Sequence, residues 1–551
     1  MLSLLLTVLL LAGCASNGQT DIPTTAPDSS GASVDMEQPT AAATDQALQA
    51  IHALGQSPDD NYRTWYELFV YSFCDSNGDG IGDLPGVLSK LDYLQELGIT
   101  GIWFMPIHPS KSYHKYNVAD YYAIDPDYGT MADMEALLAE CEKRDIHVIL
   151  DLVLNHTGDD HLWFTTAVAY LKALPDGQEP RAEDCPYVEY YNFTREAATG
   201  FNQIGGTDWY YECRFSPDMP DLNWACQSLR EDIREVMDFW LRKGVAGFRL
   251  DAAKEFYSGR DADNLEVLSW IETTARELKP DVYLVAEVWE GFSQVAKYYE
   301  SGITSLFDFP FANSDGKIVK VLRGAGQESV VSTYATALEK ADQAYLAANP
   351  DYIDAPFLSN HDLGRIAGFV SREENKVKLA GAMNLFMSGS AFLYYGEEIG
   401  MVGAGNDPSK RAPMVWNEAR DSGTTNPPPE CELPESYPFG SLEEQRREDS
   451  SIYNYYRQAI AIRQAIPAIA RGRTTAELPL NVGCVSAYRK TWETEGCIVL
   501  MNISEETAQV DLTEYASWTL AASLSANGEP ITRDGTALTL PAYGTAVLIP
   551  G

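Results

Sequence analysis

The stretch GFRLDAAK, residues 247–254, determines how the rest of this chain is interpreted. Two apolar residues precede it, so the sequence predicts a short buried strand that ends in an Arg-x-Asp pair. Successive side chains of a strand point to opposite faces, so Arg249 and Asp251 lie on the same face. A cation beside a carboxylate keeps that carboxylate ionised, as a nucleophile requires. Such a pair can also be a purely structural ion pair, so its function depends on the other motifs of the chain.

Three further apolar runs end in polar side chains in the same way. One run ends in DLVLNH (151–156), a second, VYLVAEVW (282–289), has a single carboxylate, and a third, PFLSNHD (356–362), ends in a His-Asp pair. In a barrel of parallel strands, the side chains at the carboxyl ends of the strands meet at one face, where active sites are built. The four stretches together therefore predict one site at four strand ends.

In content and order, these four stretches resemble the α-amylase family of glycoside hydrolases. The resemblance implies a (β/α)₈ barrel and a retaining cleavage of glycosidic bonds by two carboxyl groups. It implies that Asp251 is the nucleophile, held ionised by Arg249, and that Glu287 is the acid/base, with a pKa raised by neighbouring carboxylates. Asp362 would hold the distorted sugar ring, and Asp151 would orient Arg249 rather than contact the substrate.

Four more side chains receive roles from the same resemblance. His156 and His361 would stabilise the transition state through hydrogen bonds to the sugar. Tyr116 matches the aromatic platform under that sugar, although Lys115 stands where a glycine is usual. Lys254 would hold the glucan chain on the leaving-group side of the cut bond, and the alternative is that it only pairs with an acid at the surface.

Residues 58–470 alternate strand and helix patterns, as a (β/α)₈ barrel requires. We expect strands at 65–73, 99–107, 146–156, 245–251, 282–287, 306–310, around 357 and at 391–395. Between residues 157 and 223 the order is broken by a Tyr-, Gly- and Pro-rich segment without helical periodicity, which predicts a small irregular inserted domain. Its aromatic residues either stack on sugars or form the core of that domain. Short alternating strands predict a C-terminal β-sandwich domain at 471–551.

The first residues have the features of an export signal. Residues 2–11 are apolar but too few to span a bilayer, so residues 1–14 are interpreted as a signal peptide. The sequence LAGC (11–14) resembles the lipobox of bacterial lipoproteins, which implies a lipid on Cys14, although basic residues are missing before it. The alternative is a chance cysteine after an ordinary signal peptide. Residues 15–57 are expected to be a disordered tether, so the protein would be anchored by lipid to the membrane at the extracellular face of a bacterial cell.

The composition restricts the partners of this chain. Its 551 residues suffice for two or three domains, and 80 acidic against 40 basic residues give a net charge of −40. This charge argues against nucleic acid and against an anionic membrane surface, so the lipid is the expected membrane contact. A repulsive surface that keeps a monomer soluble is expected, and salt adaptation is the alternative. No cysteine pair has the spacing of a zinc or redox site.

The segment DSNGDGIGD, residues 75–83, places oxygen donors at alternate positions with glycines between them. Position twelve of the loop is Gly86 and not Glu, so the loop is not an EF-hand switch. It resembles a loop of oligo-1,6-glucosidases and related members of the family, which implies a structural Ca²⁺, with Mg²⁺ or a plain Gly/Asp turn as alternatives. A second ion is left open. The expected ligands of the first ion are Asp75, Asn77, Asp79, the backbone carbonyl of Ile81, and Asp83.

The predicted function is that of an α-amylase, which hydrolyses α-1,4-glucosidic bonds of starch-type glucans and maltooligosaccharides. Alternatives within the family are an oligosaccharide-specific α-glucosidase, a neopullulanase-like enzyme or a transglycosylase. The motif MPDLN (219–223) resembles a group between oligo-1,6-glucosidases and neopullulanases, so the choice of bond stays open. A non-catalytic glycan-binding lipoprotein is disfavoured because all three expected carboxyl groups are present.

Overall fold

Seven parallel strands form a curled sheet at the centre of the molecule. The computed structural model describes residues 41–551 except 176 and 422, and these residues form one compact unit. The strand order in the sheet is β10-β1-β2-β3-β7-β8-β9. The strands are β1 (Thr64–Leu68), β2 (Gly101–Phe104), β3 (His147–Leu152), β7 (Gly247–Leu250), β8 (Tyr283–Ala286), β9 (Ser305–Leu306) and β10 (Ala391–Tyr394).

The segment around residue 356 closes the sheet into a barrel. Ala355 forms a parallel bridge with Phe307, and the backbone N–H of Phe392 in β10 donates to the carbonyl oxygen of Pro356 at 2.8 Å. The sequence predicted a full strand here, but only this short bridge forms, because Pro356 has no N–H to continue the ladder. The (β/α)₈ barrel predicted from the sequence is confirmed.

Large aromatic side chains fill the interior of the barrel. Trp65 stacks on Tyr283 and on Phe392, with ring centroids 5.1 Å and 5.9 Å apart. Gly101 leaves room for the Trp65 ring, because a Cβ at residue 101 would lie 2.2 Å from it. This packed interior supports the strand ends from below, so the side chains at those ends stand on a rigid base.

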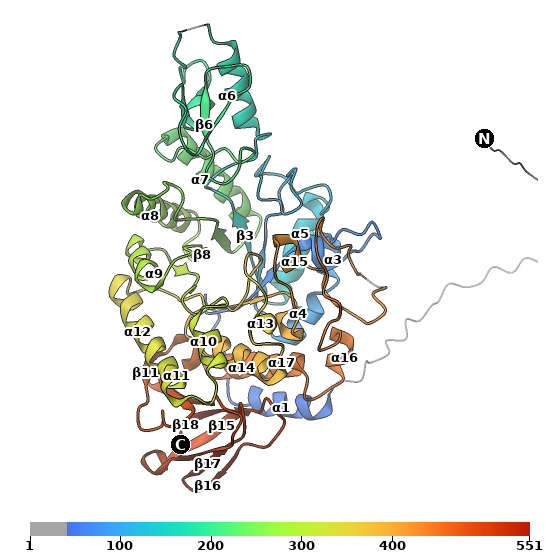
Figure 1. Cartoon of the computed structure of the whole chain (residues 1–551), viewed down its shortest axis with the longest axis vertical. Coiled ribbons are helices and arrows are strands. Elements are labelled where there is room, and N and C mark those ends of the chain that lie inside the picture. The colour runs from blue at the N-terminus through green and yellow to red at the C-terminus, as the bar shows by residue number, and fades with distance from the viewer. Residues whose placement is uncertain (1–40, 176, 422) are drawn as a thin grey trace, which may run out of the picture. The chain divides into compact units, whose positions relative to one another are not determined.

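Helices cover the outside of the barrel (Figure 1). The expected strand at 65–73 was wrong beyond Leu68, because residues 70–73 form the short helix α2 (Val70–Phe73). Among the described residues, no helix is long and apolar enough to span a membrane. The covering helices include α3 (Leu84–Leu88), α4 (Leu91–Leu97), α5 (Met131–Lys143), α7 (Gln227–Arg242), α8 (Asp261–Leu278), α9 (Phe292–Tyr298), α10 (Lys317–Arg323), α12 (Thr333–Ala348), α14 (Glu374–Leu385) and α17 (Ile452–Ala465).

A helix precedes the barrel among the described residues. Helix α1 (Ala42–His52) packs against α17 and buries Leu48 and Ile51, and the backbone N–H of Thr44 donates to Asp449 at 2.8 Å. The expected tether is therefore wrong for its last part, because tertiary packing of an apolar face stabilises a helix that composition does not reveal. The signal peptide, Cys14 and residues 15–40 lie outside the described residues.

The inserted region, residues 157–223, lies at the opposite end of the described body from the C-terminal strands (Figure 1). It has a three-stranded sheet of β4 (Phe193–Thr194), β6 (Tyr210–Glu212) and β5 (Phe201–Gln203). The expectation of no helix was wrong, because α6 (Leu162–Ala173) is mostly apolar and lacks a continuous polar stripe. Of the two roles considered for the aromatic residues, core packing describes the buried ones, which are Tyr190, Tyr191, Trp209 and Tyr211.

The C-terminal region consists of two antiparallel sheets that share one apolar core, as the sequence predicted. All eight cysteines of the described residues are free thiols, including Cys484 and Cys497 in this region. The larger sheet consists of β11 (Arg473–Ala476), β12 (Val485–Trp492), β13 (Glu495–Asn502), β18 (Thr545–Pro550) and β15 (Trp518–Leu524). The smaller sheet consists of β14 (Ala508–Asp511), β17 (Ala537–Leu540) and β16 (Thr532–Asp534).

Candidate active site

Three strand ends place three carboxyl groups around one buried arginine. The register of β3 and β7 puts Asp151 beside Arg249. Nη1 of Arg249 donates to Asp151 Oδ2 at 2.9 Å and to Asp251 Oδ1 at 2.6 Å, and its Nη2 donates to Glu287. The Arg249 side chain has no exposed surface. One guanidinium therefore orients all three carboxyl groups, and Asp151 contacts Arg249 as the sequence predicted.

The segment after residue 357 adds a second charged group to the same space. Nε2 of His361 lies 2.7 Å from Tyr116 Oη and 3.1 Å from Asp362 Oδ2. Its Nδ1 lies 2.6 Å from Oε1 of Glu67, a buried residue of β1. Nη2 of Arg411 donates to Asp362 Oδ1 at 3.1 Å. Asp362 is therefore held between an imidazole and a guanidinium.

These surroundings push the pKa values of the carboxyl groups apart. Burial raises the pKa of Glu287 to about 7, and the carboxylates of Asp251 and Asp362 add to the rise against the effect of Arg249. Partial burial opposes ionisation of Asp362, but His361 and Arg411 outweigh it and hold the pKa of Asp362 well below its usual range. Glu287 is thus able to keep a proton near neutral pH while Asp362 stays ionised.

Asp251, Glu287 and Asp362 line a cavity of about 420 Å³, which is large enough for a small ligand. The Tyr116 ring forms part of its wall and stacks on His361 with an interplanar angle of 18°. His156 lies on the same wall, with its Nε2 3.2 Å from the carbonyl oxygen of Tyr116. Phe215 of the inserted region and Trp289 also line the cavity and are 52% and 43% exposed. Aromatic faces of this kind can stack on a sugar ring.

Lys254 does not line this cavity, and neither do Arg249 and His361, which instead contact its carboxyl groups. Nζ of Lys254 lies 2.6 Å from Oε1 of Glu290 and 3.9 Å from Glu255. Of the two roles considered from the sequence, pairing with a neighbouring acid is the contact that the structure contains. The contact of Lys254 with a glucan chain stays a prediction.

Lys115, which stands where a glycine is usual, has a left-handed backbone with φ of 66°. Its Nζ lies 2.8 Å from Oδ2 of Asp125, and both side chains are 5% exposed. This buried ion pair holds the loop that carries His114 and Tyr116, in which Tyr116 N donates to His114 Nδ1 at 3.2 Å. The ion pair compensates for the backbone strain of a non-glycine residue at this position.

The loop at residues 75–83 curls around its own carboxylates. Oδ2 of Asp75 accepts a hydrogen bond from Gly80 N at 2.8 Å, and Gly78 and Gly80 have φ of 86° and 92°. Asp83 accepts one from the N–H of Gly86 at the start of α3. The donor set of three carboxylates, one amide and one backbone carbonyl offers only hard oxygen atoms, which fits Ca²⁺ or Mg²⁺.

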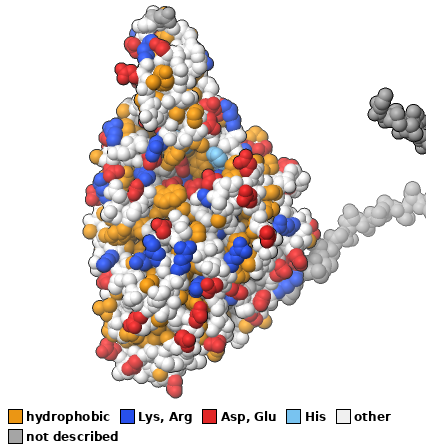
Figure 2. Space-filling model, in the orientation of Figure 1, with side chains coloured by type: hydrophobic (Ala, Val, Ile, Leu, Met, Phe, Trp, Pro, Cys, Tyr) orange, Lys and Arg blue, Asp and Glu red, His pale blue; other side chains and the backbone are white. Residues whose placement is uncertain are grey.

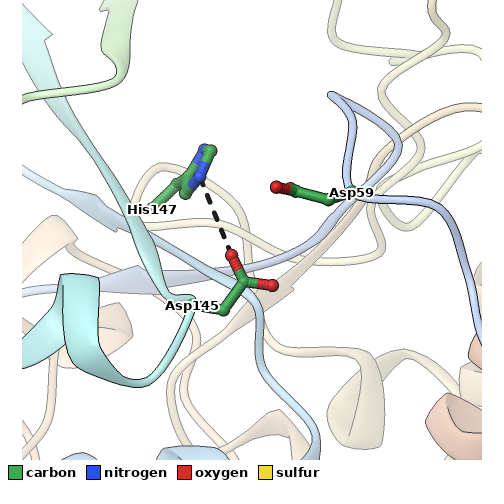
Figure 3. Close-up of side chains that lie close together, drawn as sticks. All are labelled: Asp59, Asp145 and His147. Carbon is green, nitrogen blue, oxygen red and sulfur yellow. Dashed lines mark ion pairs between the residues drawn. The ribbon is translucent and has the colours of Figure 1, made fainter.

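A second cluster of two carboxylates and a histidine lies at the amino ends of the barrel strands (Figure 3). Nη2 of Arg63 contacts Asp59 and lies 2.8 Å from His147 Nε2 and 3.5 Å from Asp145 Oδ1. A guanidinium thus already supplies the positive charge that a metal ion would bring. The side chains of Asp59 and Asp145 are 70% and 66% exposed, so the cluster is a solvated ion-pair network.

Glu67, Arg411 and Phe215 belong to the site but were not predicted from the sequence. Glu67 carried a signal, because it is the single charged residue in the buried run at 64–73. Arg411 follows the short helix α15 (Asp407–Lys410) in a loop and carried no local signal. On the face drawn in Figure 2, basic side chains are interspersed with acidic ones.

Comparisons with known proteins agree with this arrangement. The Alpha-amylase family model, described as the alpha amylase catalytic domain, matches residues 67–472. The alpha-amylase 3 of Dictyoglomus thermophilum is 36% identical over 450 residues, which cover 80% of this chain and 84% of that protein. The glucan 1,6-alpha-glucosidase of Streptococcus pneumoniae is 29% identical over 515 residues, which cover 81% of this chain and 91% of that protein. Relatives with different named activities therefore match most of the chain.

Solved structures give the same result. Eubacterium rectale Amy13B superposes with a TM-score of 0.88 and 43% identity, over 93% of this chain and 99% of that structure. The alpha-amylase from H. orenii superposes with a TM-score of 0.76 and 32% identity, over 89% of this chain and 100% of that structure. The similarity extends over the barrel and most of the regions attached to it.

Proposed function

The chain belongs to the α-amylase family of glycoside hydrolases, and we propose that it is an α-amylase that cleaves α-1,4-glucosidic bonds of starch-type glucans and maltooligosaccharides with retention. The observation that carries this proposal is the contact of Arg249 with both Asp251 and Glu287 inside one cavity, together with the raised pKa of Glu287. Retaining cleavage needs one ionised nucleophile and one protonated acid close together.

In the proposed reaction, Asp251 attacks the anomeric carbon while Glu287 donates its proton to the leaving glycosidic oxygen. The products of this step are a covalent glycosyl-enzyme and a free sugar end. Glu287, now a carboxylate, then removes a proton from water, which attacks the same carbon and releases Asp251. The alternation of Glu287 between acid and base agrees with its pKa of about 7.

The other side chains of the cavity would bind the sugar and hold its distorted ring. Asp362, ionised by its two cationic neighbours, accepts hydrogen bonds from sugar hydroxyls. His156 donates to the same sugar, and the Tyr116 ring supports its apolar face. The hydrogen bond from His361 to the sugar stays a prediction, because both ring nitrogens of His361 contact oxygen atoms of the protein. Nη1 of Arg249 donates to Asp251 Oδ1 at 2.6 Å and orients this carboxyl group for the attack.

We further infer that the loop at 75–83 binds a structural Ca²⁺ or Mg²⁺, which is supported by its hard oxygen donors. The ion takes no part in the chemistry and would stabilise the loop beside α3. A strong chelator should lower the melting temperature, because an ion at a hundred times its Kd stabilises the fold by about 2.7 kcal/mol. Asp79→Ala should remove this sensitivity. Unchanged melting of the wild type, with no ion found by elemental analysis, would leave the loop as a plain turn.

The lipobox-like sequence before residue 15 supports the proposal of a monomeric enzyme anchored by lipid at the extracellular face of a bacterial cell. Cys14→Ala should release the enzyme from the membrane fraction of the producing cells. Membrane association that does not depend on Cys14 would contradict the lipid anchor.

A product profile on starch, pullulan, isomaltose and sucrose tests the proposed bond. We expect maltooligosaccharides from starch and little product from isomaltose or sucrose. The second candidate is an enzyme for short or α-1,6-linked substrates, and the pairing of Lys254 with Glu290 favours it. If Lys254 does bind long chains, Lys254→Ala should weaken starch hydrolysis more than that of an aryl glucoside, by about 1–2 kcal/mol. An equal effect on both would favour the second candidate.

A further inference from the structure

The two ring nitrogens of His361 both face oxygen atoms. Nδ1 lies 2.6 Å from Oε1 of Glu67, and the backbone N–H of His361 donates to the same oxygen at 3.2 Å. Nε2 lies between Tyr116 Oη at 2.7 Å and Asp362 Oδ2 at 3.1 Å. The His361 and Glu67 side chains are 1% and 2% exposed, so water does not compete for these contacts.

The contacts of His361 require a proton on each of its ring nitrogens. A carboxylate has no proton to give, so the hydrogen bond between Glu67 and Nδ1 requires a proton on Nδ1. Nε2 lies 3.1 Å from Oδ2 of Asp362, which its cationic neighbours hold as a carboxylate that can only accept. Nε2 therefore also carries a proton, and the ring is an imidazolium.

We propose that Glu67 is a positioning residue, which holds His361 as an imidazolium from the barrel wall and thereby keeps Asp362 ionised and directed at the sugar. This role rests on the proposed function for its catalytic benefit. The bond to the backbone N–H and the bond to the ring fix the imidazole on its buried side, so its opposite edge faces Asp362. Glu67 itself does not line the cavity.

The benefit follows from the balance of charge in the site. The site contains five carboxyl groups and three cationic groups. When Glu287 acts as an acid, one of these carboxyl groups carries a proton. A neutral imidazole would lower the positive charge beside Asp362, and Asp362 would then compete with Glu287 for that proton. The five are Glu67, Asp151, Asp251, Glu287 and Asp362, and the three are Arg249, His361 and Arg411.

The remaining surroundings of His361 agree with a charged ring. The edge of the Trp103 ring packs against it at 5.7 Å, and Nε of Arg411 donates to its backbone oxygen at 3.1 Å. Burial alone would lower the pKa of His361, but the carboxylates of Asp362 and Glu67 raise it to about 9. The other ionisable groups close to His361 are Asp151, Glu287 and His114.

The test is an NMR titration of ¹³C-labelled histidine in the full enzyme without substrate, with the His361 signal identified by its loss in His361→Asn. In the wild type, we expect this signal to stay in its charged form from pH 5 to pH 8. In Glu67→Gln, which keeps the shape but not the charge, the midpoint should fall by about one pH unit or more. Glu398→Gln is the matched control, because Glu398 is a buried glutamate that accepts from Tyr66, the neighbour of Glu67 in β1.

The control should leave the His361 midpoint unchanged. A wild-type midpoint near 6.5 would overturn the proposal, and so would equal midpoints in the wild type and Glu67→Gln. The wild-type titration shows whether His361 is charged near neutral pH even if Glu67→Gln does not fold. The titration needs no turnover, so failure of the wild type to hydrolyse any glucan would refute the proposed function separately.

With an aryl maltoside as substrate, Glu67→Gln should lose activity between pH 6 and pH 8 more steeply than the wild type. A merely structural role of Glu67 would lower activity by the same factor at every pH. Parallel pH profiles of the two enzymes would therefore also overturn the proposal, while Glu398→Gln should follow the wild-type profile.

Discussion

The two ends of the same barrel each contain an arginine, two or more carboxylates and a histidine, but they differ in exposure. At the carboxyl ends of the strands, Arg249 has no exposed surface, and the side chains of Asp251 and Glu287 are 11% and 12% exposed. At the amino ends, Arg63 is buried, but its partners Asp59 and Asp145 are mostly exposed. The same residue types therefore meet in a low-dielectric site at one end and in water at the other.

The difference appears in the two histidines. The pKa of His361 is raised to about 9, because buried carboxylates on both sides outweigh the burial that would lower it. The pKa of His147 is lowered to about 4, because burial and the nearby Arg63 outweigh its exposed carboxylates. A cluster of charges thus becomes a candidate for chemistry when its carboxylates are buried and outnumber the cations.

The two ends of the barrel should differ most in their effect on catalysis. Asp251→Asn and Glu287→Gln should each lower kcat on starch by about 10²–10⁴-fold, because each removes a group that acts on the reacting bond. Asp145→Asn at the amino end should leave kcat about unchanged. Circular dichroism should show that all three variants remain folded. Near-wild-type activity of either cavity variant would contradict the roles assigned to Asp251 and Glu287.

The second contrast concerns stability. Arg249→Met should cost about 3–5 kcal/mol in the free energy of unfolding, because it leaves buried carboxylates without their counter-charge. Arg63→Met should cost about 1 kcal/mol, since Asp59 and Asp145 can be hydrated instead. Urea unfolding of both variants measures the difference. Equal losses would mean that burial of the carboxylates does not distinguish the two ends.

The smallest contrast concerns how stability depends on pH. The raised pKa of His361 gives a stabilisation that is complete below pH 6.5 and is lost as the pH rises through about 9. The lowered pKa of His147 has the opposite sign, because the fold favours its neutral form, so stability falls as the pH drops from 6.5 towards 4. His361→Asn should flatten the alkaline side of the melting-temperature profile, and His147→Asn the acidic side. If His361→Asn instead changed the acidic side of the profile and His147→Asn the alkaline side, the two opposite pKa shifts would be refuted.

Much of the site was predictable because its signals are local. Asp251, Glu287 and Asp362 each follow an apolar run, and a strand end in a barrel points its side chains to one face. The sequence showed Lys254 three residues after Asp251, but it did not show that the partner of Lys254 is Glu290, which follows the next strand of the sheet. Helices α1 and α6 were missed because their stabilising contacts are tertiary and their own periodicity is weak.

By itself, the sequence determined the alternation of strands and helices, the four motifs and their order, because the period of apolar residues and the end of a run are properties of neighbouring residues. Only the tertiary structure decided which of these groups share charges and protons. Glu67 and His361 are 294 residues apart, and Arg411 lies in a loop without a pattern. The physical reason is that a pKa depends on burial and on charges within a few ångströms, which the closing of the barrel brings together.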